Sequence, residues 1–224
     1  MIVELRRYTL KPGQLGPYLG AYGEKGYTVQ RRHLGPALGW FVVDVGPQNQ
    51  VVHLWTFESL AAMERQRAAM AADPDWLAIK RGMIGVFAAQ ETSVMTMVPN
   101  LHYTSGVETP GVVDIRTYTL HHGKQPELMR FLRDEASAIQ ARHWPDTIAY
   151  LASSVGPLNR IVHIWGHNDH AERLARRQAL LADPDWQRCQ KTILPMLTDM
   201  ETMTAVPAPF WGRPNSIERA PEWI

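Results

Sequence analysis

The chain contains two copies of one sequence unit, and this repeat limits its possible folds more than any other feature. Residues 3–10 (VELRRYTL) return as residues 113–120 (VDIRTYTL), and residues 72–76 (ADPDW) return as residues 182–186. The copies lie 110 residues apart and align without a gap up to Pro99. Two copies of this size are too few and too long for a solenoid. They predict two similar domains that pack about a pseudo-two-fold axis, like a homodimer fused into one chain.

Composition places the chain among ordinary globular proteins. It has 224 residues, of which 45% are hydrophobic and 20% are charged, so it can bury a large core. Its formal net charge of +1 gives no electrostatic reason to expect a nucleic-acid partner. We expect neither a signal peptide nor a membrane span, because no long apolar run occurs. The single Cys189 cannot form an internal disulfide, and together these features predict a cytoplasmic protein.

Local patterns predict the same order of elements in each copy. Leu15, Tyr18 and Tyr22 have the spacing of one helix face, and Ser59 and Asp73 are typical helix caps. In the first copy the expected strands are residues 3–10, 40–45, 51–57 and 91–98, and the expected helices are residues 14–34, residues 59–72 and a further helix from residue 74. This split β-α-β-β-α-β order is the ferredoxin-like arrangement.

Domain boundaries follow from the repeat. We expect a first ferredoxin-like repeat at residues 1–99, a linker at residues 100–112, a second repeat at residues 113–206 and an extended tail at residues 207–224. The tail contains four prolines and lacks periodicity, so we expect it to lie over the surface. Its apolar Phe210, Trp211 and Trp223 predict further association into a homodimer or a higher homo-oligomer.

The repeated motifs are together similar to those of the NIPSNAP family. They are ELRxYTL at residues 4–10, GxxNxVxHxW at residues 46–55, DPxW at residues 73–76 and Glu91 at the start of the last strand. The second copy carries matching residues at Asp114, Arg116, Tyr118, Gly156, Asn159, His163, Trp165, Asp183, Pro184, Trp186 and Glu201. The similarity covers nearly the whole chain apart from the linker and the tail.

This resemblance implies a fold more clearly than a reaction. It implies an α+β protein of the dimeric α/β-barrel type, with two ferredoxin-like repeats packed sheet-to-sheet in one chain. The wider superfamily includes haem enzymes, cofactor-free oxygenases, lyases, isomerases and proteins that only bind a ligand. Because one fold hosts many activities, function has to be argued from the site itself.

Polar residues inside the strands are the best candidates for a site. Glu4, Arg6 and Tyr8 share one face of the first strand, and His53 and Trp55 share one face of the third. We expect the apolar face of each sheet to lie under the helices. The polar face would then point between the sheets, opposite its matched set in the second copy, which is Asp114, Arg116, Tyr118, His163 and Trp165.

This set suggests chemistry on a small organic anion. His53 would carry a proton, Arg6 and Tyr8 would hold an oxyanion, and Glu4 would complete the catalytic group. The other expected binding residues are Trp55, Trp40, Asn49, Gly23, His163, Tyr118 and Arg116. The alternative is structural, because Glu4–Arg6 and its second-copy equivalent can be buried ion pairs that fix strand register. His53 and His163 can equally be histidines fully hydrogen-bonded within the core.

The first helices of the two copies differ in their glycine content. Gly20, Gly23 and Gly26 form a stripe of small residues in the first copy. Such a stripe leaves room for a ligand or for another backbone. If only one copy holds a functional pocket, we therefore expect it in the first. The alternative is a weak, irregular helix with no further role.

Metal and nucleotide chemistry have little support. His163, His167 and His170 have metal-like spacing, but only His163 has a histidine at the matched position, which is His53. A His-Glu-x-x-His motif and a glycine-rich phosphate loop are both missing from the sequence. We therefore expect no metal and no cofactor. His33 and His143 also match, but a histidine near a helix C-terminus is favoured by the helix dipole alone.

Three functions remain open. The first is a cofactor-independent enzyme of the lyase, isomerase or oxygenase class that acts on a small organic acid or carbonyl compound. The second is a non-catalytic module that binds a metabolite or a partner, and the third is a haem enzyme with a histidine ligand. The enzyme hypothesis predicts a histidine whose ring nitrogens are unsatisfied and lie near tyrosine or arginine. The binding-module hypothesis predicts that these groups satisfy one another.

Overall fold

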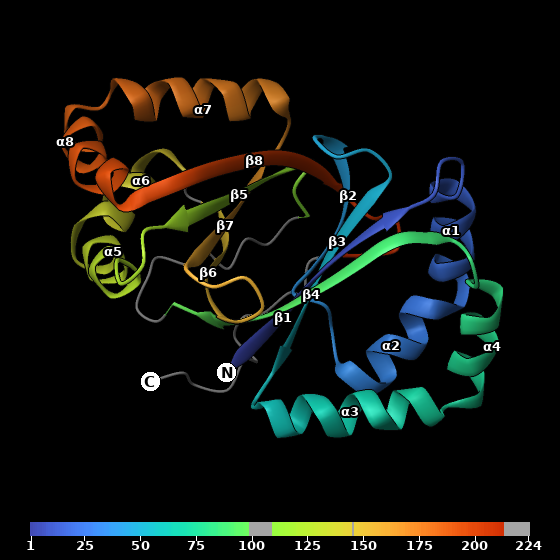
Figure 1. Ribbon diagram of the computed structural model, residues 1–224. Helices are drawn as coiled ribbons and strands as arrows, with labels where there is room; N and C mark the ends of the chain where they lie inside the picture. Colours follow the sequence, from blue (N-terminus) through green and yellow to red (C-terminus); the bar gives the residue numbers. More distant parts are fainter. Residues whose placement is uncertain (99–108, 145, 213–224) are drawn as a thin grey trace.

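The computed structural model describes residues 1–98, 109–144 and 146–212, and it shows two groups of helices on either side of a set of strands (Figure 1). The elements of the first half are β1 (Ile2–Leu10), α1 (Leu15–Ala21), η1 (Tyr22–Gly26), α2 (Tyr27–Leu34), β2 (Gly39–Val45), β3 (Gln50–Phe57), α3 (Leu60–Ala72), α4 (Pro74–Gly82) and β4 (Phe87–Met97). Those of the second half are β5 (Val112–Leu120), α5 (Gln125–Phe131), η2 (Leu132–Ala136), α6 (Ser137–His143), β6 (Thr147–Val155), β7 (Arg160–His167), α7 (His170–Ala182), α8 (Pro184–Ile193), η3 (Leu194–Met196) and β8 (Leu197–Pro207).

Local chemistry explains where the helices begin. The Ser59 side chain accepts a hydrogen bond from the backbone N–H of Ala62 at the start of α3. Asp73 caps α4 in the same way, with Pro74 in the first helical turn, and Asp183 repeats this cap at α8. The long first helix of each half contains one turn of π-helix, η1 or η2, at matched positions. A π-turn often marks a functional region of a helix.

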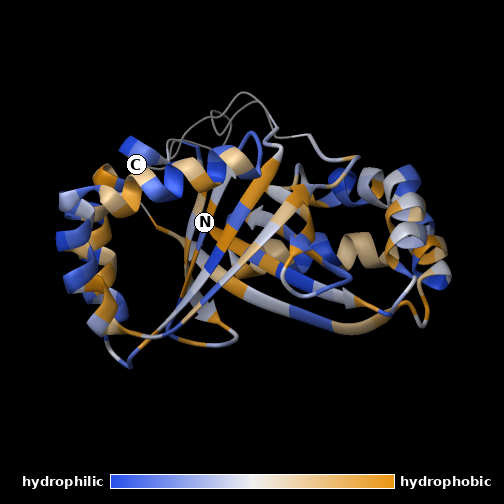
Figure 2. Ribbon diagram, turned by 90° about the horizontal axis from the view of Figure 1, so that it is seen from above, coloured by the Kyte–Doolittle hydropathy of each residue, from blue (hydrophilic) through white to orange (hydrophobic). Residues whose placement is uncertain are grey.

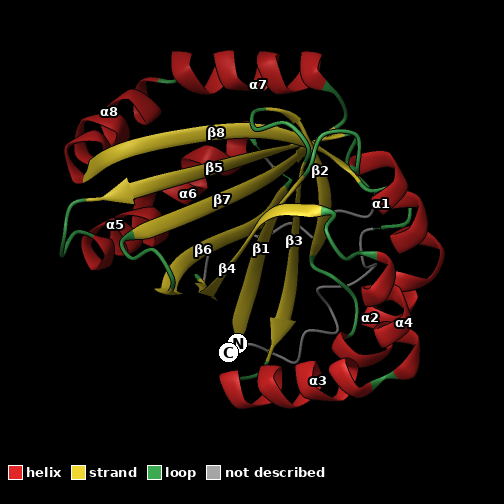
Figure 3. Cartoon of the chain, turned by 45° about the vertical axis from the view of Figure 1, so that its right-hand side comes forward, coloured by secondary structure: helices red, strands yellow, loops and turns green. Residues whose placement is uncertain are grey.

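The strands form one closed barrel in the order β1-β3-β2-β8-β5-β7-β6-β4 (Figure 3). Every pair of neighbours is antiparallel. The two halves join at their strand edges, through β2 with β8 and β4 with β6. The two sheets that we expected to face each other are therefore opposite walls of a single barrel. Closure leaves no free edge to pair with another chain.

The expected direction of the strand side chains is wrong. Arg7 reaches Thr117 of the other half across the barrel interior, whereas Glu4 is bonded to Arg67 of the outer helix α3. The barrel interior is therefore lined by an alternating set that includes Val3, Leu5, Val52, Leu54, Val113, Ile115, Val162 and Ile164. The polar set of Glu4, Arg6, Tyr8, His53 and Trp55 lies under the helices, and so does its matched set Asp114, Arg116, Tyr118, His163 and Trp165.

Burial on both faces explains this error. Each strand has the barrel core on one side and a helix layer on the other, so alternation alone does not say which face is which. The apolar set lies inside the barrel, and the interior of an eight-stranded barrel is narrow enough for side chains to fill it or for one small ligand to bind. The polar set lies beneath the helices, where Arg67 of α3 forms an ion pair with Glu4 and Arg173 of α7 forms one with Asp114. Figure 2 shows hydrophobic residues concentrated along the strands and a mixed distribution along the helices.

The chain beyond β8 returns to the first half. The backbone N–H of Ala208 donates to the carbonyl of Trp40, and the Trp211 indole donates to the carbonyl of Ala37. Phe210 packs against the ring of Tyr22. The described part of the tail is thus packed into the core of the first half and does not lie over the surface as expected. Trp223 and residues 100–108 of the expected linker lie outside the described residues.

No helix in the described ranges combines the length and the apolar character needed to cross a bilayer.

Candidate functional site

A cluster of charged residues lies under the helices of the first half. Glu4 on β1 is 3% exposed and is paired with Arg67 of α3. The Arg6 guanidinium lies 3.6 Å from the other carboxylate oxygen, and its Nε donates to Thr92. The expected Glu4–Arg6 contact is present, but the shorter bond is made by Arg67, which was not among the expected site residues. Such a paired, buried carboxylate fits the structural alternative.

His53 is enclosed by aromatic rings. The Trp55 indole N–H donates to its Nδ1 over 2.7 Å. Its ring stacks on Trp40 at a centroid distance of 5.4 Å and meets Tyr8 edge-on at 4.9 Å. Burial, with a smaller effect from nearby arginine charge, holds the pKa of His53 well below its usual value. The imidazole is therefore neutral, with its proton on Nε2.

Aromatic side chains fill the space around His53. Tyr18, Tyr22 and Trp40 pack ring to ring beneath the first helix, and Phe210 closes the cluster from the chain's C-terminal segment. A Cβ at Gly23 would lie 2.8 Å from the Phe210 ring. The room that the glycine stripe was expected to leave for a ligand is therefore occupied at Gly23 and Gly26, whereas Gly20 has open space beside it. The occupying rings are this chain's own, Phe210 at Gly23 and Tyr22 at Gly26.

The second half repeats the charged cluster with different partners. Asp114 is fully buried, and one of its oxygens accepts hydrogen bonds from both Arg116 and Arg173, each at 3.0 Å. The Arg116 guanidinium also lies over the rings of Trp144 and Trp165, 4.3 Å and 5.6 Å from their centroids. Arg116 is thus held in place by a carboxylate and by two aromatic faces. Sequence reasoning identified Arg116 but not Arg173 or Trp144.

His163 differs from its first-half equivalent. It is 3% exposed, and neither of its ring nitrogens has a hydrogen-bond partner among the described residues. The rings of Tyr118 and Tyr150 meet it edge-on, with centroids 5.1 Å and 4.4 Å away. Burial lowers the pKa of His163 to about 3, with a smaller contribution from the Arg116 charge. An unpaired buried imidazole is costly, and in a native structure it points to a partner that binds there.

A cavity of about 100 Å³ opens beside His163. Its polar wall is formed by Arg116, Tyr118, His163, Gln140 and Arg177. Apart from Gln190 of α8, the remaining wall is apolar and comes from α5, η2, the end of α6, α7, α8, η3 and β8, with the main side chains being Leu128, Leu132, Trp144, Leu180, Leu181, Trp186, Ile193, Leu194, Leu197 and Met200. Three of these, Leu181, Leu194 and Met200, are exposed and mark the opening.

The cavity exists because smaller residues replace aromatic ones. Leu128 and Leu132 stand where the first half has Tyr18 and Tyr22, and Leu197 stands where it has Phe87. A leucine is smaller than tyrosine or phenylalanine, so space remains under the helices. These exchanges were visible in the aligned repeats. They were the signal that would have placed the pocket in the second half.

Gln140 adds an amide to the site that sequence reasoning missed. Its Oε1 accepts a hydrogen bond from the Tyr150 hydroxyl at 2.8 Å. The matched Gln30 accepts from Tyr22 in the first half. Each half therefore has a buried glutamine at the same position, Gln30 on α2 and Gln140 on α6, that accepts a hydrogen bond from a tyrosine. In the second half it holds one edge of the cavity.

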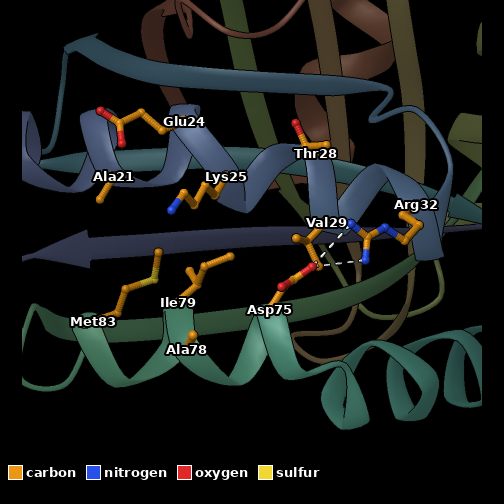
Figure 4. Close-up of a pocket in the computed structure, with 11 residues that line it drawn as sticks. Ala21, Glu24, Lys25, Thr28, Val29, Arg32, Asp75, Ala78, Ile79 and Met83 are labelled. Atoms are coloured by element: carbon orange, nitrogen blue, oxygen red, sulfur yellow. Dashed lines mark hydrogen bonds and ion pairs between the residues drawn. The ribbon is translucent and has the colours of Figure 1, made fainter.

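A larger groove lies on the outside of the first half, between η1 and α2 on one side and α4 on the other (Figure 4). It encloses about 550 Å³. Lys25 and Val29 face Ile79 and Met83 across it. At one end Arg32 pairs with Asp75, as the dashed lines in Figure 4 show. The groove is wide, and its charged groups are exposed or already paired, so it lacks the enclosed, unpaired polar groups of a reaction site.

The repeated asparagines and the histidines at the helix C-termini have structural roles. Asn49 lies in the β2–β3 turn with φ of 55°, and its carbonyl accepts from the N–H of Leu10. Asn159 repeats this left-handed turn with φ of 58°. Asparagine tolerates this conformation, so both residues shape hairpins. His33 and His143 are bonded to the helix-capping residues Asp73 and Asp183.

The three histidines with metal-like spacing are not brought together. His163 lies beside the cavity, whereas His170 is exposed and is bonded to Asp44. His167 is buried against the ring of Trp144. Within the described ranges, His, Cys, Asp and Glu residues form no group of three or more that could hold a metal ion.

These features define a class of protein: a closed α/β barrel made of two repeated units in one chain, each with a polar cluster beneath its helices. The NIPSNAP family model matches residues 3–101 and 113–211. The chain belongs to the NIPSNAP family, and both of its halves are NIPSNAP units.

Known relatives agree with this assignment. The chain is 23% identical over 211 residues to NipSnap homolog 3A of Homo sapiens, a match that covers 92% of this chain and 83% of the human protein. It is 25% identical over 212 residues to a NipSnap homolog of Dictyostelium discoideum, covering 92% and 87% of the two chains. The solved structure of an anthrone oxidase-like protein superimposes with a TM-score of 0.61 at 9% identity, covering 92% of this chain and 90% of the other. That likeness is one of fold alone.

Proposed function

We propose that the second half of the chain binds a small organic acid or carbonyl compound in the cavity beside His163. We propose further that the protein is a cofactor-independent enzyme of the lyase, isomerase or oxygenase class. The observation that carries this proposal is the unpaired imidazole of His163, buried in the wall of a cavity that also contains Arg116 and Tyr118. Unpaired titratable groups in an enclosed cavity are the usual marks of a reaction site.

Each polar group has a distinct role in this proposal. Arg116 holds the anionic oxygen of the ligand, because its position is fixed by Asp114 and by the Trp144 ring. Burial raises the pKa of the Tyr118 phenol although Arg116 opposes the shift, so Tyr118 stays protonated and donates a hydrogen bond. His163 offers one donor and one acceptor nitrogen to the reacting end of the ligand.

Ligand binding would also change the basicity of His163. In the free protein its pKa is about 3, so the imidazole is a weak base. A carboxylate or an enolate next to it would favour the charged imidazolium and raise this pKa. Proton transfer by His163 would then depend on a ligand that carries or develops negative charge. This dependence suits isomerase or lyase chemistry next to a carbonyl group.

The size of the cavity restricts the ligand. A volume of about 100 Å³ lies well below the range of roughly 300–1,000 Å³ that is usual for drug-sized ligands. The substrate would therefore have only a few non-hydrogen atoms. The cavity as formed is too small for a porphyrin, which argues against the haem hypothesis.

We also propose that each half keeps the ferredoxin-like arrangement inside the barrel. The strands of the first half lie in the order β4-β1-β3-β2, which supports this arrangement.

A second candidate function is ligand binding without turnover. The low pKa of His163 favours it, because a neutral imidazole can hydrogen-bond a carbonyl group without moving a proton. The same residues would hold the ligand under both proposals. The two proposals differ only in whether the bound ligand is converted into a product.

A thermal-shift screen with small organic acids and carbonyl compounds tests the site. We expect ligands that stabilise the wild type to lose their effect in His163→Gln and in Leu132→Tyr, which restores the tyrosine of the first half and fills the cavity. His53→Gln is the matched control and should keep the response. Each binding compound is then followed by NMR for conversion. Conversion supports the enzyme and binding without conversion supports the module, whereas an equal shift in wild type and Leu132→Tyr contradicts both.

A further inference from the structure

A polar cavity lies inside the mouth of the barrel, on the opposite face of β5 from the proposed reaction site. It encloses about 390 Å³ and is built by both halves. The first half contributes Arg7 from β1 and Ser93 from β4, and the second half contributes Thr117, Ser153 and Arg160. Nothing in the proposed function uses these residues. The cavity therefore needs its own explanation.

Arg7 is only partly satisfied in this cavity. One guanidinium nitrogen donates to the Thr117 hydroxyl over 2.8 Å, and another lies 4.0 Å from a carboxylate oxygen of Glu201. The third nitrogen, Nε, is buried and has no hydrogen-bond partner among the described residues. A guanidinium has five N–H donors, so Arg7 keeps unused donors inside the cavity. Leaving a buried charged donor unpaired is costly unless something else binds it.

Arg160 adds a second positive charge to the same cavity. It lies on β7, is half-buried, and makes no side-chain hydrogen bond or ion pair within the described parts of the chain. The pKa of Arg7 is lowered chiefly by burial, and the positive charge of Arg160 lowers it further. Glu91 and Glu201 offset part of this charge, but both are exposed at the rim. Two guanidiniums gathered over hydroxyl groups form an arrangement that suits an oxyanion.

Three of the polar residues that line the cavity are matched by less polar residues in the other copy. Ser93 and Ser153 line the cavity, whereas their matched residues are Met203 and Val43. Arg160 is matched by the neutral Gln50. The two copies therefore differ in polarity at these three positions, although Glu91 and Thr92 of the lining are repeated as Glu201 and Thr202. Divergence of this kind is not needed to fill a barrel core, which apolar side chains do better.

We propose that this cavity is an anion site for a small molecule that carries a carboxylate or phosphate group. Arg7 and Arg160 bind the charged group, and the hydroxyls of Ser93, Thr117 and Ser153 complete its hydrogen bonds. The apolar remainder of the ligand packs against Leu5, Met95 and Val162 in the deeper wall. The site is separate from the His163 cavity, because residues on alternate positions of β1 and β5 point to opposite faces.

Binding of inorganic phosphate and of citrate to the full chain, measured by calorimetry, tests this site. Arg160→Gln is the main variant, because it installs the residue of the first half and removes no side-chain hydrogen bond or ion pair made within the described residues. We expect it to weaken binding about ten-fold or more, as loss of one charge-assisted hydrogen bond does. Ser93→Met, which copies Met203, should fill the cavity and abolish binding. Glu91→Gln removes a negative charge at the rim and should strengthen binding.

The control is Arg133→Gln, which removes an exposed arginine paired with Asp134 on the far side of the helix layer. It should bind as the wild type does. Binding of phosphate alone or of citrate alone supports the site and identifies the preferred group. Equal affinities in wild type, Arg160→Gln and Ser93→Met would overturn the proposal, and so would the failure of both anions to bind. Because His163→Gln leaves this cavity intact, it should bind phosphate normally, which separates this test from that of the proposed function.

Discussion

Trp55 donates its indole N–H to Nδ1 of His53 over 2.7 Å, and the equivalent His163 receives no such bond among the described residues. The two histidines occupy the same place in two copies of one unit. In the first copy the tautomer is fixed by a neighbour and the surroundings are packed with rings. In the second copy both nitrogens are left for a ligand. His53 keeps one buried nitrogen, Nε2, without a partner among the described residues, whereas His163 keeps two and lies beside a cavity, so His163 is the stronger candidate for chemistry.

The first prediction concerns Phe210. Phe210→Ala should lower the free energy of unfolding by about 2–4 kcal/mol, because a cavity would form between Tyr22 and Trp40. The measurement is urea unfolding followed by tryptophan fluorescence. Ile84→Ala is the control, since Ile84 is 81% exposed and its truncation should change stability by less than about 0.5 kcal/mol. Equal stability of the two variants would show that the tail does not support the first half.

The second prediction concerns the buried carboxylate of Asp114. Asp114→Asn should destabilise the protein by about 3–5 kcal/mol, because Arg116 and Arg173 would keep their charge without its partner. Asp134→Asn breaks an exposed ion pair with Arg133 and should have little effect. Chemical unfolding of both variants measures the two changes in the free energy of unfolding. A small loss for Asp114→Asn would mean that water reaches this cluster.

The third prediction is a pH dependence of stability that comes from His163. The unfolded chain protonates this residue below about pH 6.5, whereas the folded chain does so only near pH 3. Between these values the unfolded state binds more protons, so the stability contributed by neutral His163 falls as the pH is lowered. His163→Gln should reduce the slope of unfolding free energy against pH by up to about 1.4 kcal/mol per unit.

Unfolding measured at several pH values between 3 and 7 tests this slope. The control is His170→Gln, which replaces an exposed histidine bonded to Asp44. A slope for His163→Gln equal to that of the wild type would show that His163 is already paired or hydrated, and it would also weaken the proposed function.

The fourth prediction concerns a single half. Residues 1–99 alone should self-associate, because β2 and β4 lose the partners that close the barrel. Arg7→Thr should tighten this association, since two Arg7 side chains would otherwise meet where Arg7 now meets Thr117. Light scattering measures both effects, and the same instrument tests the expected homodimer of the full chain. A folded, monomeric fragment would contradict the prediction.

The repeat predicted the overall architecture correctly. Gap-free matching of two units indicated two halves in one chain, and the family motifs indicated an α/β barrel, which the closed strand order and the family match confirm. Helix caps such as Ser59 and Asp73 were also visible in the sequence, because capping depends on neighbouring residues only.

The site was harder to predict for physical reasons. Which face of β1 points outward depends on burial on both sides, so alternation of Leu5 and Arg6 gave no direction. The position of Phe210 against Gly23 joins residues far apart in the chain, and no local pattern encodes it. By contrast, the replacement of Tyr22 by Leu132 was present in the aligned copies. Side-chain volume at matched positions was therefore the better guide to the cavity.

The hydrogen bond between Arg7 and Thr117 joins two residues at the same position of the repeat. Equivalent residues touch only where they lie close to the pseudo-two-fold axis. In a dimer of identical chains, a residue on the axis always meets its own copy, so an arginine there would face an arginine. A fused chain is free of that constraint. Two unlike residues can therefore meet near the axis of this barrel, which no symmetric dimer of identical chains allows.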